Sequence, residues 1–141
     1  MSMFKVFDIA SSALTAQSIR MNTTASNLAN ANSVSSSIDQ TYKARKPIFA
    51  AELDWANGGS ANPAAVGVNV KGIVESEAPL QVRYDPNHPM ANKDGYIYMP
   101  NVNVVEEMTD MIEGSRSYQS NVEVINTAKQ LAMRTLSIGQ N

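Results

Sequence analysis

Residues 103–137 read NVVEEMTDMIEGSRSYQSNVEVINTAKQLAMRTLS. Steps of four and three residues alternate along this stretch without a slip, which is the spacing of a long helix that packs on another helix along one stripe. The positions selected by these steps are Val104, Met108, Met111, Ser115, Tyr118, Val122, Ile125, Lys129, Ala132 and Leu136. Asn103 can cap the start of this helix, with Glu106 at the third position of a capping box, and Gly139 can terminate it. The pattern predicts one helix over 103–137.

A second helix is predicted at the amino-terminal end. Phe7, Leu14, Met21 and Leu28 repeat at an interval of seven residues, which gives one apolar stripe over about three heptads. We expect Asn30 and the serines that follow it to stop the helix, because Asn accepts the left-handed capping conformation. At 1.5 Å per residue the two helices would be roughly 40 and 50 Å long. Neither helix fits inside a compact globule of 15.3 kDa.

The middle of the chain follows a different pattern. All six prolines lie between positions 47 and 100, and apolar residues alternate with a period of two at 66–70, 80–84 and 96–98. These signals predict short strands, with a flexible loop near 57–62. We therefore expect a mainly α, α+β fold, in which the terminal helices pair as a coiled-coil-like antiparallel hairpin beside a small β-rich middle domain. The expected boundaries are 1–33, 34–100 and 101–141.

Composition excludes several classes of function. The 141 residues carry a net charge of -2, no cysteine and one histidine, and no basic run that would bind nucleic acid. His88 lies in a turn beside Pro89, so we reject it as part of a catalytic triad with Asp85 and a serine. Glu75 and Glu77 share one face of a predicted strand, where paired acids are usually just solvated. We predict no enzyme, and no catalytic, cofactor-binding or metal-binding residues.

The first helix also has an unusual surface. Residues 1–33 carry only three charges, Lys5, Asp8 and Arg20, among many Ser, Thr and Asn residues. A helix that meets water alone normally has charges on its outer face, so we infer that neighbouring subunits cover this one. The alternative is an ordinary α+β domain in which both helices pack on the β unit. No apolar stretch is long enough to span a bilayer, and Asp8 interrupts any secretory signal.

Three runs of sequence resemble a known family. Residues 25–30, ASNLAN, resemble the amino-terminal signature of the bacterial flagellar rod and hook axial proteins. Residues 99–108, MPNVNVVEEM, and 116–127, RSYQSNVEVINT, are similar to the carboxy-terminal signature of the proximal-rod member of that family. Together with the opening residues 7–17 and the strand before Pro100, the resemblance covers about two thirds of the chain.

The resemblance implies a structural role. Members of this family are subunits of the flagellar basal body; the flagellar type III export apparatus exports them from the cytoplasm without a cleaved signal peptide. They assemble helically through their terminal helices into the periplasm-spanning rod, a driveshaft that transmits motor torque. The implied partners are copies of the chain and other rod proteins, with no nucleic acid, no small-molecule substrate and no membrane span.

The candidate site is therefore a subunit interface along both helices. The resemblance places Asn27, Leu28, Asn30, Tyr118, Gln119 and Asn121 in the inner helical layer of the rod. With the apolar stripes, the predicted interface residues are Phe7, Leu14, Met21, Asn27, Leu28, Asn30, Met108, Met111, Tyr118, Gln119, Asn121, Val122, Ile125 and Leu136.

A second class of function stays open at this point. Amphipathic helices also bind client helices in grooves, so the chain could be a soluble helical-hairpin export adaptor or chaperone. A chaperone of this kind would be a folded dimer with ordered ends. An axial subunit would instead be a monomer whose terminal helices are largely disordered until neighbours cover them.

Overall fold

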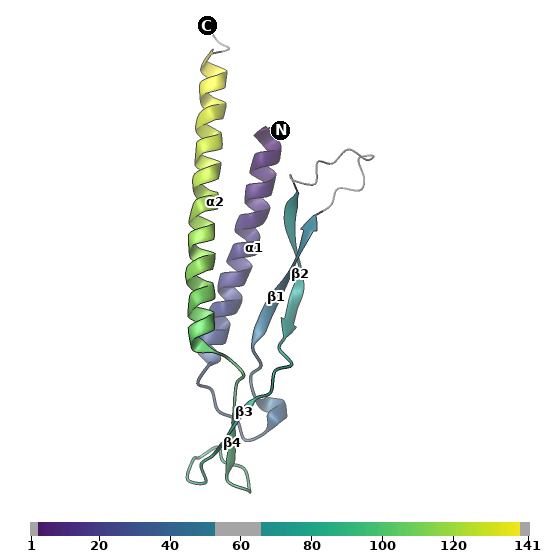
Figure 1. Cartoon of the computed structure of the whole chain (residues 1–141), viewed down its shortest axis with the longest axis vertical. Coiled ribbons are helices and arrows are strands. Elements are labelled where there is room, and N and C mark those ends of the chain that lie inside the picture. Colours follow the sequence, from purple (N-terminus) through teal and green to yellow (C-terminus); the bar gives the residue numbers. More distant parts are fainter. Residues whose placement is uncertain (1–2, 53–65, 139–141) are drawn as a thin grey trace. The chain divides into compact units, whose positions relative to one another are not determined.

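The computed structural model describes residues 3–52 and 66–138 (Figure 1). Two long terminal helices enclose the β structure in the sequence, so the fold is mainly α within an α+β class, as predicted. In chain order the elements are α1 (Met3–Asn30), a short 3-10 helix (Ile38–Gln40), β1 (Arg45–Glu52), β2 (Gly67–Glu75), β3 (Gln81–Tyr84), β4 (Tyr96–Met99) and α2 (Val104–Ile138). The loop predicted near 57–62 lies outside the described residues, as does the helix stop predicted at Gly139.

The start of α2 confirms the predicted cap. The Oδ1 atom of Asn103 accepts hydrogen bonds from the backbone N–H groups of Val105, at 3.2 Å, and Glu106, at 3.5 Å. These groups have no partner inside the helix, so the Asn103 side chain stabilises the first turn. The Glu106 carboxylate does not turn back to complete a capping box. It accepts a hydrogen bond from Lys46 Nζ at 3.0 Å instead.

The end of α1 differs from the prediction. No non-glycine residue of the described chain has a positive φ, so the expected left-handed conformation at Asn30 is wrong. The backbone N–H and the hydroxyl of Ser33 both donate to the carbonyl oxygen of Asn30, at 3.0 and 2.8 Å. Because Ser33 satisfies this carbonyl, the helix ends without the left-handed turn.

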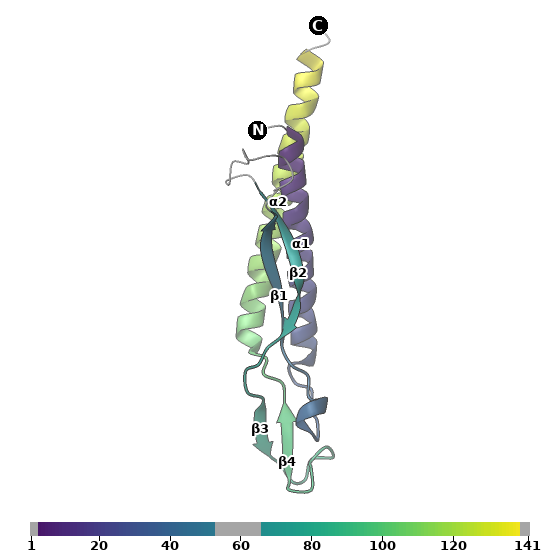
Figure 2. The same cartoon turned by 90° about the vertical axis from the view of Figure 1, so that its right-hand side faces the viewer.

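The strands form two separate two-stranded sheets, β1 with β2 and β3 with β4. In the second sheet Gln81 lies opposite Met99 and Tyr84 opposite Tyr96, in an antiparallel register (Figure 2). The period-two pattern predicted β2, β3 and β4, but β1 was not predicted, because Arg45-Lys46-Pro47 does not alternate. A two-stranded ribbon has only edge strands, and an edge strand tolerates Pro47.

The chain divides into two compact units. The first unit contains Met1–Ile19, Ile48–Gly72 and Glu113–Asn141, and the second contains Arg20–Pro47 and Ile73–Ile112. In the first unit Ser12 joins α1 to β2, since its Oγ accepts the N–H of Val68 at 3.1 Å and donates to the carbonyl of Ile9 at 2.8 Å. A Cβ atom on Gly67 would lie 3.0 Å from the same Oγ, so the glycine permits this close approach.

The second unit has a small core with a polar surround. Ala31, Ala44 and Val102 are buried together, and the half-buried Tyr42 packs on them. The segment after α1 pairs with β4, because Ser35 and Tyr98 exchange two backbone hydrogen bonds of 3.0 Å. Arg20 bonds Asp110 at 2.9 Å near the start of α2. Ser35, which follows α1, pairs with Tyr98, which precedes α2, and Arg20 earlier in α1 contacts Asp110 later in α2, so the two helices run antiparallel in this unit.

Candidate assembly interface

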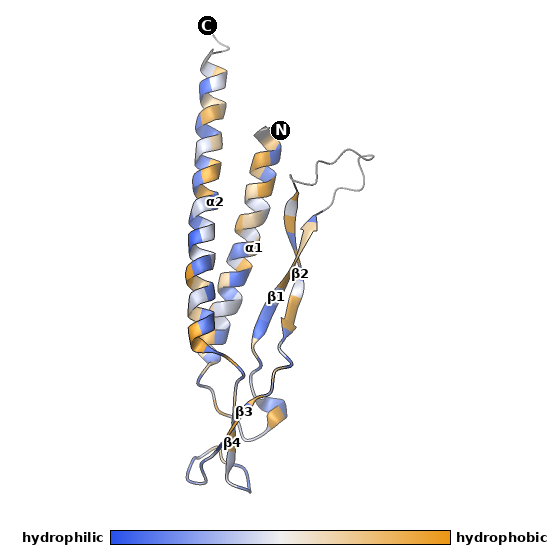
Figure 3. Ribbon diagram, in the orientation of Figure 1, coloured by the Kyte–Doolittle hydropathy of each residue, from blue (hydrophilic) through white to orange (hydrophobic). Residues whose placement is uncertain are grey.

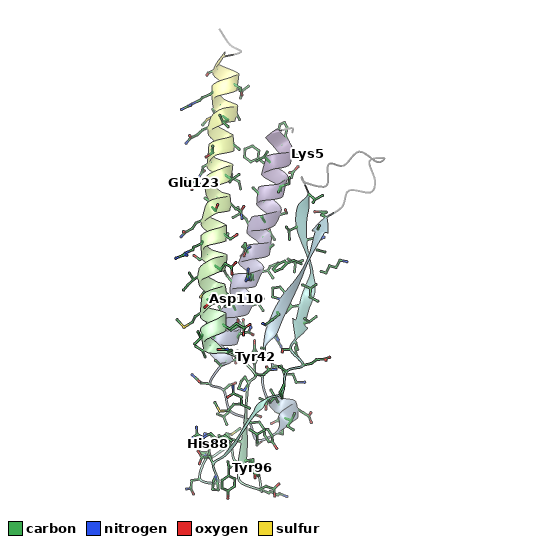
Figure 4. All side chains as sticks on the ribbon, viewed as in Figure 1. Lys5, Tyr42, His88, Tyr96, Asp110 and Glu123 are labelled. Atoms are coloured by element: carbon green, nitrogen blue, oxygen red, sulfur yellow. The ribbon has the colours of Figure 1, made fainter. Side chains whose placement is uncertain are left out.

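The described residues hold no recognisable catalytic or metal centre. No group of three or more His, Asp or Glu side chains among residues 3–52 and 66–138 could hold a metal ion. The imidazole Nδ1 of His88 accepts the backbone N–H of Met90 at 3.1 Å, so this ring closes its own turn near the tip of the β3–β4 hairpin (Figure 4). Glu75 forms an exposed ion pair with Arg45, at 3.3 Å, and Glu77 is exposed. Neither helix has an apolar stretch that would cross a membrane.

Large apolar side chains stand exposed along α2. Met108 is 53% exposed and Leu136 is 68% exposed, and Tyr118 and Val122 are also on the surface. Gln119 is exposed, whereas Met111, Asn121 and Ile125 are half-buried. Hydrophobic residues recur along the helix in Figure 3, interleaved with hydrophilic ones. A periodic row of exposed apolar side chains usually marks a surface that binds a partner.

The predicted residues of α1 are placed differently. Phe7, Leu14, Met21 and Leu28 are all half-buried, so the chain itself covers part of this stripe. Asn30 is also half-buried, and its Nδ2 donates to the carbonyl of Ser26, one turn earlier in the same helix. Asn27 is only 1% exposed, and its amide bonds Tyr42 and the backbone of Arg45. Asn27 thus has a role inside its own chain that the sequence analysis did not predict.

Asn121, one of the predicted interface residues, belongs to a row on α2 that the four-and-three spacing did not predict. Gly114 and Ala128 are buried, and Asn121 between them is half-buried, at intervals of seven residues. Seven residues is close to two helical turns, so these positions share one face. The sequence contains this signal, but the larger apolar residues of the predicted stripe masked it. The exposed side chains of Val105, Ile112, Leu131 and Met133 were missed as well.

An open groove runs along the helices of the first unit. Its volume is about 550 Å³, and it is lined by Val6 of α1 and by Ser120, Glu123, Val124, Thr127, Ala128 and Leu131 of α2. Figure 4 shows Glu123 near the middle of α2. Most of this lining is apolar or uncharged, so the groove can accept side chains from another helix. It places Val6, which the sequence analysis did not select, beside the carboxy-terminal half of α2.

Two side chains of the second unit, Lys46 and Tyr42, have raised pKa values. The hydrogen bond from Lys46 to Glu106 raises the pKa of the Lys46 ammonium group above its ordinary value. Burial raises the pKa of the Tyr42 hydroxyl, and the Arg45 charge works against that rise. Both groups therefore stay protonated well above neutral pH. Lys46 keeps its charge and Tyr42 keeps its donor, which bonds Asn27 Oδ1 at 2.8 Å.

Comparison with known proteins decides the family. Residues 7–35 match the family described as "Flagella basal body rod protein", and residues 93–138 match "Flagellar basal body rod FlgEFG protein C-terminal". The chain is 47% identical to the flagellar basal-body rod protein FlgC of Salmonella typhimurium over 140 residues, which cover 99% of the chain and all of that protein. The chain belongs to the FlgC family of flagellar basal-body rod proteins.

Other members of the FlgC family agree. The FlgC protein of Escherichia coli O6:H1 is also 47% identical over 140 residues, with 99% of the chain and all of that protein covered. That of Borreliella burgdorferi is 35% identical over 155 residues, with 99% of each chain covered. The chain is thus a structural subunit of the flagellar basal-body rod, it is not an enzyme, and it assembles with rod subunits. Family membership favours the axial subunit over the helical-hairpin chaperone.

Proposed function

We propose that the subunit assembles helically through α1 and α2, and that neighbouring helices cover the exposed apolar row of α2. We call the side chains of Tyr118, Val122, Met133 and Leu136 the outer row. The observation that carries the proposal is their exposure on a helix that buries the small residues Gly114 and Ala128 instead. The neighbours would be other copies of the chain and other rod proteins. The half-buried stripe of α1, from Phe7 to Leu28, would complete the contact.

Hydrophobic burial supplies the driving force in this proposal. Moving a Val or Leu side chain from water into a packed interface stabilises the assembly by about 1.5 to 3 kcal/mol. A row of such side chains left in water gains nothing in the isolated subunit, whereas each becomes favourable when a neighbour covers it. Contacts spread along α2 would also distribute torque over many side chains, which is what a driveshaft in the periplasm requires.

The remaining parts of the proposal follow from the family. We infer that the flagellar type III export apparatus delivers the chain without a cleaved signal peptide. The parts at 1–33 and 101–141 would then be axial helices on either side of a β-rich part at 34–100. The scarcity of charge in residues 1–33 supports this, because a surface covered by neighbours needs few charges for solubility.

The test replaces one outer-row residue by a charge. Val122→Arg should abolish basal-body assembly and swimming while leaving expression and export intact, because an unpaired charge is costly in a packed interface. Gln130→Arg is the matched control, since Gln130 is an exposed polar residue on the same helix and receives the same side chain. The readouts are basal-body yield and swimming in a strain that depends on the variant, together with secreted protein.

Leu28→Arg is the corresponding change on α1, and it should have the same effect. Normal swimming with both Val122→Arg and Leu28→Arg would remove these positions from the interface. Equal loss of basal bodies in Val122→Arg and Gln130→Arg would show that α2 is sensitive to any added charge, and would refute a specific role of the outer row.

A further inference from the structure

Two asparagine side chains converge on the backbone at the start of β1. The Oδ1 of Asn27 accepts the N–H of Arg45 at 2.9 Å, and its Nδ2 donates to the carbonyl of the same residue at 2.8 Å. The Oδ1 of Asn101 accepts the N–H of Ala44, the residue before Arg45, at 2.8 Å. Two neighbouring backbone donors are thus satisfied by side chains from distant parts of the sequence. Both asparagines and both backbone groups belong to the second unit.

Further hydrogen bonds connect Ser76, Ala78 and Tyr42 to these asparagines and to Ala44. Asn101 Nδ2 donates to the carbonyls of Ser76, at 3.3 Å, and Ala78, at 2.8 Å. The N–H of Ser76 donates to the carbonyl of Ala44 at 2.7 Å, and the hydroxyl of Tyr42 donates to Asn27 Oδ1 at 2.8 Å. Figure 4 shows Tyr42 at this junction, beside the end of α1. We call this network the asparagine clasp.

The clasp is closed to water at its centre. Asn27 is 1% exposed and Ala44 is 3% exposed, so their polar groups have no solvent to replace a lost partner. The Asn27 amide bonds both the donor and the acceptor of Arg45, in the way a neighbouring β-strand would. An apolar side chain at position 27 would leave both groups of Arg45 without that partner.

We propose that Asn27 and Asn101 are positioning residues for rod assembly. They fix the start of β1 against α1 and against the segment before α2 within one subunit, before any neighbour binds, so the disorder expected of the terminal helices in an isolated subunit does not extend to residues 20–31. Assembly needs this preset backbone, and it does not need a contact between Asn27 and another subunit. The proposal rests on the assembly role proposed above, but its structural part is measurable in the isolated chain.

The chain supplies a control within the same sequence motif. Asn30 follows Asn27 by three residues, and its Nδ2 bonds only the carbonyl of Ser26 in its own helix. Asn30→Ala therefore removes an amide of the same size without touching the clasp. Its effect on the backbone of Arg45 should be negligible.

The first experiment measures amide hydrogen exchange by NMR in the purified full-length chain at low concentration, where no neighbour is present. Asn27→Ala should make the Arg45 amide exchange about 10- to 100-fold faster than in the wild type. The amide of Asp85, bonded to the carbonyl of Gly95 at 2.9 Å in the β3–β4 hairpin, should not change. Asn30→Ala should leave both amides as they are.

The second experiment uses the isosteric variant Asn27→Asp and its dependence on pH. A charged carboxylate accepts from Arg45 N–H but repels the Arg45 carbonyl, whereas a protonated carboxyl group can donate to that carbonyl as the amide does. Burial raises the pKa of such a carboxyl above the ordinary value of about 3.9. The ratio of variant to wild-type exchange at Arg45 should therefore fall towards one between pH 7.5 and pH 4. If Asn27→Ala does not fold, the Asn27→Asp experiment tests the proposal in its place.

The outcomes separate the clasp from the interface. Faster Arg45 exchange together with loss of basal bodies in Asn27→Ala supports the proposal. Unchanged exchange in the isolated chain overturns it, and loss of basal bodies in that case would assign Asn27 to a contact with a neighbour. Faster exchange with normal basal bodies also overturns it, since assembly would not need the clasp. A pH-independent exchange ratio in Asn27→Asp overturns the assigned hydrogen bonds. None of these results depends on Val122 or the outer row.

Discussion

Replacing Gly95 by Ala should weaken the β3–β4 hairpin by an amount that the structure allows us to work out. Gly95 has a φ of +81°, in the region that L-residues avoid. Its N–H donates to the carbonyl of Asn92 at 3.0 Å and its carbonyl accepts the N–H of Asp85 at 2.9 Å, so the turn cannot relax without losing these bonds. The conformational cost for an alanine in this region is about 1 to 2 kcal/mol.

The added methyl group also meets the Tyr84 ring. A Cβ atom on Gly95 would lie 2.9 Å from Tyr84 Cε2 and 3.2 Å from Pro86 Cβ. Proline is rigid, so the tyrosine ring must move, and it is free to do so because it is 64% exposed. Its movement breaks the edge-to-face contact with Tyr96, whose ring centre is 5.2 Å away, at a cost of about 0.5 to 1.5 kcal/mol. The two costs add to about 1.5 to 3.5 kcal/mol of local stability.

The assay is amide hydrogen exchange of the hairpin, with a second glycine as control. A loss of about 1.5 to 3.5 kcal/mol corresponds to roughly 10- to 400-fold faster exchange of the Asp85 amide. Gly72 lies in β2, has no atom within 4 Å of an added Cβ and has no positive φ. Gly72→Ala should therefore leave exchange unchanged or slightly slower, because alanine restricts the unfolded chain. Equal exchange of Asp85 in Gly95→Ala and Gly72→Ala would refute the reasoning.

Three further predictions concern pH, the turn histidine and the isolated subunit. The pKa values of Tyr42 and Lys46 are raised above 10.0 and 10.5, respectively. The stability that each group contributes is therefore complete below its ordinary pKa and is lost as the pH rises through its raised pKa. Urea unfolding from pH 8 to 11 should show this loss of stability, and the loss should be smaller in Tyr42→Phe. His88→Ala and His88→Gln should leave swimming unchanged, because the ring bonds only its own turn, and loss of swimming with normal export would reveal a missed contact. In the isolated chain residues 3–19 should exchange their amides much faster than residues 20–31, which belong to the unit that holds the clasp, and equal rates in both halves of α1 would contradict this assignment.

The helices could be predicted from the sequence because their signal is local and repeated. The four-and-three spacing from Val104 to Leu136 fixes a helix and the period of its apolar stripe, and Asn103 marks its start. The same spacing does not say which face the chain buries against itself. Gly114 and Ala128 face inward, and Tyr118 and Val122 remain on the surface. Small residues allow closer approach of another backbone than large ones, and this depends on the packed structure rather than on hydropathy.

The asparagine clasp could not be predicted, since it depends on contacts between distant parts of the sequence. Asn27 and Arg45 are 18 residues apart, and Ala44 and Asn101 are 57 apart. Nothing in the residues around Asn27 distinguishes it from Asn30, although one is buried and the other bonds its own helix. β1 was missed for a related reason. Its first residues are charged or proline and do not alternate with apolar ones. The strand is held instead by hydrogen bonds from the Asn27 side chain and by pairing with β2.

The row of Gly114, Asn121 and Ala128, spaced seven residues apart, has a consequence for how such subunits can diverge. The small side chains on the inner face support the subunit's own packing, while the bulky ones on the outer face contribute little to it. Substitutions of Tyr118 or Val122 by other large apolar residues can therefore change which neighbour fits, at little cost to the stability of the free chain. Partner preference and folding stability then vary independently. Related axial proteins could acquire distinct neighbours in this way while keeping the same pair of helices.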